Sequence, residues 1–171
     1  MIKIPIANPS LDKREATAAY KVIKKGWISM GSQVAQLEKK IEKYIGVKYA
    51  ILFNNGTSAL HAALSYYGVK KGDEVIVPTL SYISSANVVI YCGAKPIFCE
   101  VDPNTFNVRE EDIIKKITKK TKAIITVDLK GMPVDYDNLK KKLKKFKIPL
   151  ISDSAEAFGA IYKKKKVGSQ F

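Results

Sequence analysis

The sequence predicts an α/β fold in which helices cover both faces of a mainly parallel β-sheet. Short, continuous apolar runs of strand type alternate with segments that have helical periodicity, and short loops join them. Strands that are separated by helices run parallel, because each crossover returns the chain to the same end of the sheet. The 171 residues contain no internal repeat and no Pro/Gly/Ser linker, and they are enough for one domain with a real core.

Two helices are expected before the first strand. Ser10 or Asp12 can cap the first one, which Gly26 ends. Ser32 caps an amphipathic second helix, and Gly46 ends it as a C′ glycine. The glycine-bracketed loop between the helices holds the only tryptophan, and it is either a turn with an anchoring aromatic residue or a functional loop.

A strand, a turn and a helix then follow in a pattern on which the function depends. Residues 49–53 form a nearly continuous apolar run, and helical spacing begins at Leu60. The turn between them leaves unpaired N–H groups at a helix N-terminus, where the helix dipole favours an anion. Gly56 lets an anion approach the backbone, and the hydroxyls of Thr57 and Ser58 can donate to it. The turn is either a phosphate cradle or an ordinary polar helix cap.

The rest of the chain continues the alternation of strands and helices. The expected strands are 75–77, 96–101, 123–128 and 149–152, and the expected helices lie around 86–91, 113–117 and 136–146.

Polar groups fall where the expected strands end, and ligands of open parallel sheets bind at that edge. These groups are the Asn54–Ser58 turn, the Pro78–Tyr82 loop, Asp128 and Asp153. Tyr82 offers a flat π surface to an aromatic cofactor. A buried carboxylate such as Asp153 needs a cationic partner or takes up a proton, and a protonated ring nitrogen of a cofactor would serve.

The composition limits the classes of function. The net charge is +14, from 30 basic and 16 acidic residues, which suits a polyanionic partner. Arginine, which grips phosphates and reads bases, occurs only at Arg14 and Arg109, so nucleic-acid binding is not favoured. The lysine runs at 140–145 and 163–166 are expected to be solvated faces or loop tips.

Targeting and metal-binding signals are not found in the sequence. No apolar run approaches the ~20 residues that span a bilayer, and the N-terminus has no signal core, so we expect a cytoplasmic protein without a membrane partner. Cys92 and Cys99, with one histidine, form neither a disulfide framework nor a usual zinc site. Both cysteines are expected in the core.

Together these elements resemble the sugar aminotransferases of the DegT/DnrJ/EryC1/StrS family, which use pyridoxal 5′-phosphate (PLP) in the fold-type I architecture. The resemblance runs over essentially the whole chain. It implies that residues 1–171 are the N-terminal portion of the large PLP-binding domain. The fragments that carry it, in this order, are Gly26–Ser29, Asn55–Leu60, Gly72–Thr79, Asp153–Gly159 and Lys166–Gly168.

The resemblance implies a role for each matching residue. Gly56, Thr57 and Ser58 match the turn that binds the cofactor phosphate, and Tyr82 matches the aromatic residue that stacks on the pyridine ring.

The remaining matches concern the other atoms of the ring and the substrate. Asp153 matches the aspartate that pairs with the pyridinium nitrogen, and Glu156 matches a polar position beside the phenolic oxygen. Trp27 and Ser29 are candidates for the substrate side.

Two departures from the family pattern stand out. Where the family usually has a His–hydrophobe–aromatic–Gly run, this chain has Asp128–Gly131, which changes the local pocket contacts. The family's Schiff-base lysine lies beyond the position of Phe171, and residues 163–166 belong to the preceding hairpin. No catalytic residue is therefore assigned, and we expect the small C-terminal domain to be absent and the 171-residue polypeptide to be inactive alone.

The implied activity is transfer of an amino group from glutamate to a keto group of a nucleotide-linked sugar, for amino-sugar or cell-surface polysaccharide biosynthesis. The complete enzyme would be a homodimer. Two alternatives stay open. One is a PLP-dependent relative that dehydrates the sugar at C3, and the other is a non-catalytic remnant that binds a nucleotide or polyanion through its lysines.

Overall fold

The computed structural model describes residues 8–170, and the chain divides into two compact units between Leu37 and Glu38. The first unit holds α1 (Lys13–Lys24) and the start of α2 (Ser32–Ile45). The cap of α1 is Asp12, whose carboxylate accepts the N–H of Arg14 at 2.6 Å. Glu15 accepts the N–H of Asp12 at 2.8 Å and completes a capping box. Asp12 rather than Ser10 is therefore the first cap.

The second unit is built on a four-stranded parallel sheet in the order β2-β1-β3-β4. Its strands are β1 (Glu74–Pro78), β2 (Lys95–Cys99), β3 (Thr121–Val127) and β4 (Leu150–Asp153). A separate antiparallel hairpin pairs β5 (Ile161–Tyr162) with β6 (Lys165–Lys166). The predicted parallel sheet is confirmed, and the lysine run at 163–166 lies in this hairpin.

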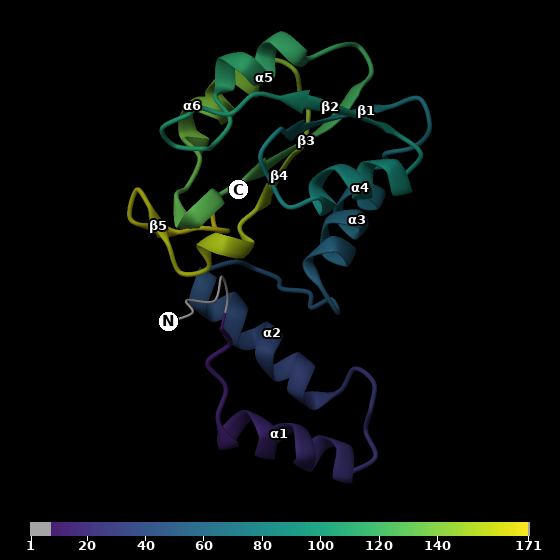
Figure 1. Cartoon of the computed structure of the whole chain (residues 1–171), viewed down its shortest axis with the longest axis vertical. Helices are drawn as coiled ribbons and strands as arrows, with labels where there is room; N and C mark the ends of the chain where they lie inside the picture. Colours follow the sequence, from purple (N-terminus) through teal and green to yellow (C-terminus); the bar gives the residue numbers. More distant parts are fainter. Residues whose placement is uncertain (1–7, 171) are drawn as a thin grey trace, which may run out of the picture. The chain divides into compact units, whose positions relative to one another are not determined.

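Helices cover both faces of the sheet (Figure 1). On one face lie α3 (Gly56–Tyr66) and α4 (Ser84–Tyr91), and on the other lie α5 (Glu110–Lys116) and α6 (Tyr136–Leu143). Two short 3₁₀ turns, η1 (Leu129–Gly131) and η2 (Ala155–Ala157), follow β3 and β4. Among residues 8–170 no helix is long and apolar enough to cross a membrane.

Each face of the sheet has its own apolar core, because neighbouring side chains of a strand point to opposite faces. The α3/α4 core includes Leu60, Leu64, Val75, Val77, Val88, Val89, Ala123 and Ile125. The α5/α6 core includes Ile76, Cys99, Ile113, Ile124, Tyr136, Leu139 and Leu143. Cys99 is buried as expected, and burial raises the pKa of its thiol to about 11, whereas Cys92 is only half-buried.

The strand predicted over residues 49–53 is wrong. The N–H groups of Ala50 and Leu52 donate to the carboxylates of Glu42 and Glu38 on α2, at 3.4 and 3.0 Å, and not to a neighbouring strand. An apolar run predicts an extended backbone, but a strand also requires a paired neighbour. The other predicted strands and helices are confirmed, with small differences at their ends.

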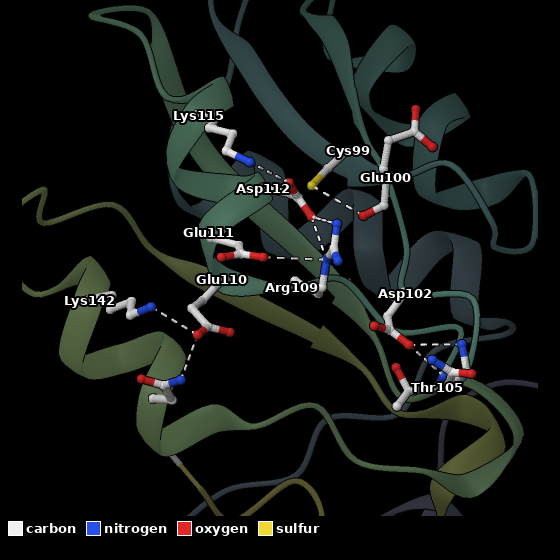
Figure 2. Close-up of polar contacts among 12 residues, drawn as sticks. Cys99, Glu100, Asp102, Thr105, Arg109, Glu110, Glu111, Asp112, Lys115 and Lys142 are labelled. Atoms are coloured by element: carbon white, nitrogen blue, oxygen red, sulfur yellow. Dashed lines mark hydrogen bonds and ion pairs between the residues drawn. The ribbon is translucent and has the colours of Figure 1, made fainter.

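The helices α5 and α6 are joined by a polar contact at Glu110 (Figure 2). One oxygen of Glu110, Oε1, accepts from Nδ2 of Asn138 at 2.6 Å and from Nζ of Lys142 at 2.9 Å. The hydrogen bond from Lys142 holds the pKa of Glu110 below its usual range. The ionised form therefore stabilises the packing of the two helices.

We expect Glu110→Gln to lower the free energy of unfolding by about 1 kcal/mol at neutral pH. A carboxyl whose pKa is lowered by folding contributes stability above its unfolded pKa and loses it as pH falls through the folded pKa. The difference between the two proteins should therefore vanish in acid. Urea unfolding at several pH values measures it.

Glu111→Gln is the matched control for this test. The carboxylate of Glu111 is more exposed and lies 3.8 Å from Nε of Arg109, so its loss should change stability little. Equal effects of the two substitutions would contradict a specific role for Glu110.

Candidate functional site

The candidate site lies at the carboxyl edge of the sheet. The strands β1, β3 and β4 are parallel neighbours, so the segments that follow them meet at this edge. The helix α3 packs back on the sheet through Leu60 and Leu64 and leads into β1, so its first turn lies toward the same edge. The second unit therefore brings together the α3 N-terminus, the loop after β1 and the ends of β3 and β4.

The first turn of α3 is open to a ligand. Asn55 is its cap, and its side-chain oxygen accepts the N–H of Ser58 at 2.8 Å. Helix geometry leaves the N–H groups of Gly56 and Thr57 without an acceptor in the preceding turn. Apart from its chain neighbours and the backbone of α3, no atom of residues 8–170 lies within 4 Å of a Cβ built at Gly56, and Gly56 does not have a positive φ. Neither packing nor strain requires glycine here, so the free space suits the approach of an anion.

The alternation of side chains along β4 decides which way Asp153 points. Ile151 packs against the α3/α4 core, whereas Leu150 packs against the α5/α6 core. Asp153, two residues after Ile151, therefore belongs to the α3/α4 face, and Ser152 belongs to the other face. Asp153 thus lies on the face of the sheet that α3 covers.

The same argument places Asp128 on the opposite face. Ile124 belongs to the α5/α6 core, so the side chains four residues later in β3 and its extension point the same way. Asp128 is fully buried and accepts hydrogen bonds from Val134 N–H (2.9 Å), Tyr136 Oη (2.7 Å), Ser152 Oγ (3.1 Å) and Ser154 Oγ (2.6 Å). Asp128 follows β3 at the carboxyl edge of the sheet, as expected, but its carboxylate faces the α5/α6 layer and accepts hydrogen bonds from protein donors.

Asp153 is half-buried, and its carboxylate can accept further hydrogen bonds. Its Oδ1 accepts the N–H of Ala155 at 3.1 Å, and no ion pair involves Asp153 within the described residues. Burial raises the pKa of Asp153, and the negative charges of Asp128 and Glu156 raise it further. A cation placed against this carboxylate would offset these effects. A protonated ring nitrogen fits that requirement.

Glu156 lies in η2 and accepts a hydrogen bond from the turn that follows β3. Its Oε2 accepts the N–H of Lys130 at 2.7 Å. Lys130 has a φ of +54° and places its ammonium 4.0 Å from the centre of the Phe106 ring. The Asp128–Gly131 departure from the family pattern therefore forms an ordered turn that contacts Glu156.

A buried asparagine braces this turn from the other side. Nδ2 of Asn107 donates to the carbonyl of Met132 at 2.8 Å, and its Oδ1 accepts the N–H of Leu129 at 3.3 Å. The sequence reasoning missed Asn107, and it also missed Tyr136, Ser152 and Ser154 as partners of Asp128. These contacts could have been expected from the polar residues that lie inside or beside apolar runs, since a buried polar group must find a partner.

Tyr82 lies in the loop between β1 and α4 and is 74% exposed. The hydroxyls of Ser81 and Ser85, 2.7 Å apart, join this loop to the first turn of α4. The ring of Tyr82 is thus free to cover a ligand, as its predicted stacking role requires.

Trp27 and Ser29 belong to the first unit. Nε1 of Trp27 donates to the carbonyl of Met30 at 3.0 Å and closes the predicted loop. Both residues line a cavity of about 160 Å³ that α2 borders. The indole is an anchoring aromatic, and the substrate-side role of both residues stays a prediction.

Comparison with known proteins gives consistent matches over nearly the whole chain. A model of the DegT/DnrJ/EryC1/StrS aminotransferase family matches residues 9–170. GDP-perosamine synthase of Caulobacter vibrioides is 45% identical over 168 residues, which is 98% of this chain and 45% of that protein. The chain therefore spans about half the length of the curated relatives it matches.

The chain also matches solved structures over nearly its whole length. The PLP form of a putative sugar aminotransferase from Streptococcus pneumoniae matches with a TM-score of 0.92 at 32% identity, over 98% of this chain and 47% of that chain. GDP-4-keto-6-deoxy-D-mannose-3-dehydratase from E. coli, with bound hydrated PLP, matches with a TM-score of 0.89 at 32% identity. That match covers 99% of this chain and 45% of the dehydratase.

We expect Asp153→Asn to stabilise the ligand-free protein at neutral pH. Folding raises the pKa of Asp153, so the ionised side chain opposes folding; that penalty is absent below the usual carboxyl pKa and grows as pH rises. The gain over the wild type should shrink to nothing in acid. Thermal unfolding across pH measures it.

Asp102→Asn is the control of opposite sign. Backbone N–H groups of Asn104 and Thr105 lower the pKa of Asp102, so its loss should reduce stability at neutral pH. A wild type more stable than Asp153→Asn at neutral pH would show that Asp153 already has a favourable partner in the protein.

Proposed function

We propose a function for this protein from one established premise: the chain belongs to the DegT/DnrJ/EryC1/StrS aminotransferase family. The cofactor of that family is PLP. The proposed activity is transfer of an amino group from glutamate to a keto group of a nucleotide-linked sugar, in the synthesis of amino sugars or cell-surface polysaccharides. The observation that carries the proposal is the half-buried Asp153, which has no ion pair among residues 8–170 and lies on the face of the sheet that α3 covers.

The chemistry of the residues at the carboxyl edge supports the binding of PLP. The free N–H groups at Gly56 and Thr57, with the hydroxyls of Thr57 and Ser58, would hold the phosphate. The exposed ring of Tyr82 would cover the pyridine ring.

Two carboxylates would interact with polar atoms of the cofactor ring. Asp153 would keep a proton on the ring nitrogen, and Glu156 would lie beside the phenolic oxygen. When bound, PLP supplies an electron sink for the carbanion of the amino acid, and the protonated nitrogen strengthens that sink. We propose that residues 1–171 are the N-terminal portion of the large PLP-binding domain.

Two of the four lysines of the β5–β6 hairpin, Lys163 and Lys166, have partners within the protein. Nζ of Lys163 donates to Asp137 at 2.8 Å, and Nζ of Lys166 lies 3.3 Å from the centre of the Tyr44 ring. We therefore propose that the amine that attaches the cofactor is not a hairpin lysine.

The substrate and the assembly are also proposals. The names of GDP-perosamine synthase and of the GDP-sugar 3-dehydratase both contain a GDP-linked sugar, which supports a nucleotide-linked sugar here. We propose a homodimer for the complete enzyme, as the family resemblance implies. A dehydratase that removes oxygen from C3 is the second candidate, because the E. coli 3-dehydratase matches with a TM-score of 0.89.

An isotope experiment separates the two activities. The full-length protein is incubated with PLP, ¹⁵N-glutamate and GDP-4-keto-6-deoxy-D-mannose, and the sugar is analysed by mass spectrometry. Appearance of ¹⁵N in the sugar supports the aminotransferase. An unlabelled product that has lost the C3 oxygen supports the dehydratase. Salt-sensitive binding of polyanions, with neither reaction, supports the non-catalytic alternative.

We expect Gly56→Ala to separate stability from cofactor binding. Alanine at this open, helical position should leave the free energy of unfolding unchanged or raise it by up to about 1 kcal/mol. The added methyl group fills the space that the phosphate would use, so the affinity for PLP should fall about ten-fold. The affinity for pyridoxal, which has no phosphate, should not change.

Gly46→Ala is the matched control, because Gly46 has a φ of +84° at the end of α2. Its substitution should lower stability by about 1 kcal/mol without changing the preference for PLP over pyridoxal. If Gly56→Ala leaves that preference unchanged, the α3 N-terminus does not bind the phosphate.

We also expect the 171-residue polypeptide, mixed with PLP and glutamate, to show no turnover. The physical reason is that Lys163 and Lys166 of the hairpin have other partners. Release of 2-oxoglutarate is the measurement, and sustained release would overturn this expectation. The full-length protein under the same conditions is the positive control.

A further inference from the structure

The two serines that flank Asp153 are held by one buried carboxylate. Oδ2 of Asp128 accepts from Ser154 Oγ at 2.6 Å and from Ser152 Oγ at 3.1 Å. The two serine hydroxyls also lie 2.8 Å apart. The residues before and after Asp153 are therefore fixed on the side of the sheet opposite to the Asp153 side chain.

Asp128 also holds Asp153 directly through the backbone. Its N–H donates to the carbonyl of Asp153 at 3.0 Å, and this bond extends the pairing of β3 with β4 beyond Val127. Asp153 is the last residue of β4, which is an edge strand among the described strands. An edge strand has only one neighbour to restrain its end, so these contacts with Asp128 carry much of that restraint.

Both oxygens of the Asp128 carboxylate accept hydrogen bonds. Oδ1 of Asp128 accepts the N–H of Val134 and the hydroxyl of Tyr136, whereas Oδ2 accepts from the serines. Tyr136 comes from α6 and is itself fully buried. Val134 and Tyr136 thus hold one oxygen of the carboxylate from the α6 side. The other oxygen holds Ser152 and Ser154 at the end of β4.

The anchoring is made by a buried anion without a basic partner, since no ion pair involves Asp128 among residues 8–170. Desolvation makes such a group expensive unless donors surround it, and an apolar residue would fill the space at lower cost. The same negative charge acts on Asp153 and contributes to the rise of its pKa. The negative charge of Asp128 therefore favours a cation beside Asp153.

We propose that Asp128 is a positioning residue for Asp153: it holds the two flanking serines so that the Asp153 carboxylate is presented to the pyridine nitrogen of the cofactor. This inference rests on the proposed function for the identity of the ligand. Asp128 touches neither cofactor nor substrate and acts only through the end of β4.

The test uses the full-length protein with ¹³C-labelled aspartate carboxyls. The Asp153 signal, assigned by its loss in Asp153→Asn, is titrated in the cofactor-free protein, and PLP affinity is measured separately by fluorescence. Ser154→Ala removes one hydroxyl link and leaves the buried carboxylate with its other donors. We expect the Asp153 midpoint to fall toward that of an ordinary carboxyl, because the released side chain becomes better solvated. The affinity for PLP should fall about five-fold.

Three further variants make the test specific. Ser154→Thr keeps the hydroxyl and should restore both the midpoint and the affinity. Asp128→Asn should lower the midpoint as Ser154→Ala does, provided that it folds. Ser65→Ala, at an exposed serine of α3, should change nothing.

The outcomes distinguish this inference from the function on which it rests. If Ser154→Ala lowers the melting temperature but leaves the Asp153 midpoint and the PLP affinity as in the wild type, Asp128 has a structural role only and the inference fails. If the wild type does not bind PLP, the proposed function fails. A moved midpoint in the cofactor-free protein would still support the control of Asp153 by Asp128.

Discussion

The arrangement of the second unit depends on a buried carboxylate that has to be satisfied without a counter-ion. Asp128 stands where β3 ends, and its acceptors are filled from α6, from the segment that leads into α6 and from β4. A charged group removed from water must find donors at each of its oxygens, and those donors have to come from fixed elements. The carboxyl end of the sheet is ordered because this requirement is met by three different segments at once.

The alternation of side chains along the strands determines which polar groups at this end of the sheet can meet a ligand. Asp128 and Asp153 follow adjacent strands, yet they face opposite layers, because each lies an even number of residues from a core residue of its own layer. A shift of β4 by one residue would exchange the roles of Ser152 and Asp153. The carboxylate that faces α5 and α6 stabilises the fold, and the carboxylate that faces α3 and α4 remains available to a ligand.

The electrostatics of the open face suit a ligand with both signs of charge. The first turn of α3 presents N–H groups and hydroxyls to an anion, whereas Asp153 and Glu156 favour a cation or a hydrogen-bond donor. A phosphate and a protonated ring nitrogen, joined in one molecule, match these two ends. This is the chemistry of PLP, which the matching family uses.

The alternation of strands and helices, the glycine at the start of α3 and the positions of the polar groups after each strand follow from the amino-acid sequence alone. Periodicity and capping are local properties of the chain, so the limits of α1, α2 and α3 follow closely from them. Three-dimensional packing was needed to show that residues 49–53 are not a strand, since strand pairing requires a neighbour. Packing also places Asp128 among hydroxyls on the α5/α6 face, whereas Asp153 points to the α3/α4 face. Two aspartates that look alike after two apolar runs acquire different roles because packing, and not local sequence, selects which layer each one meets.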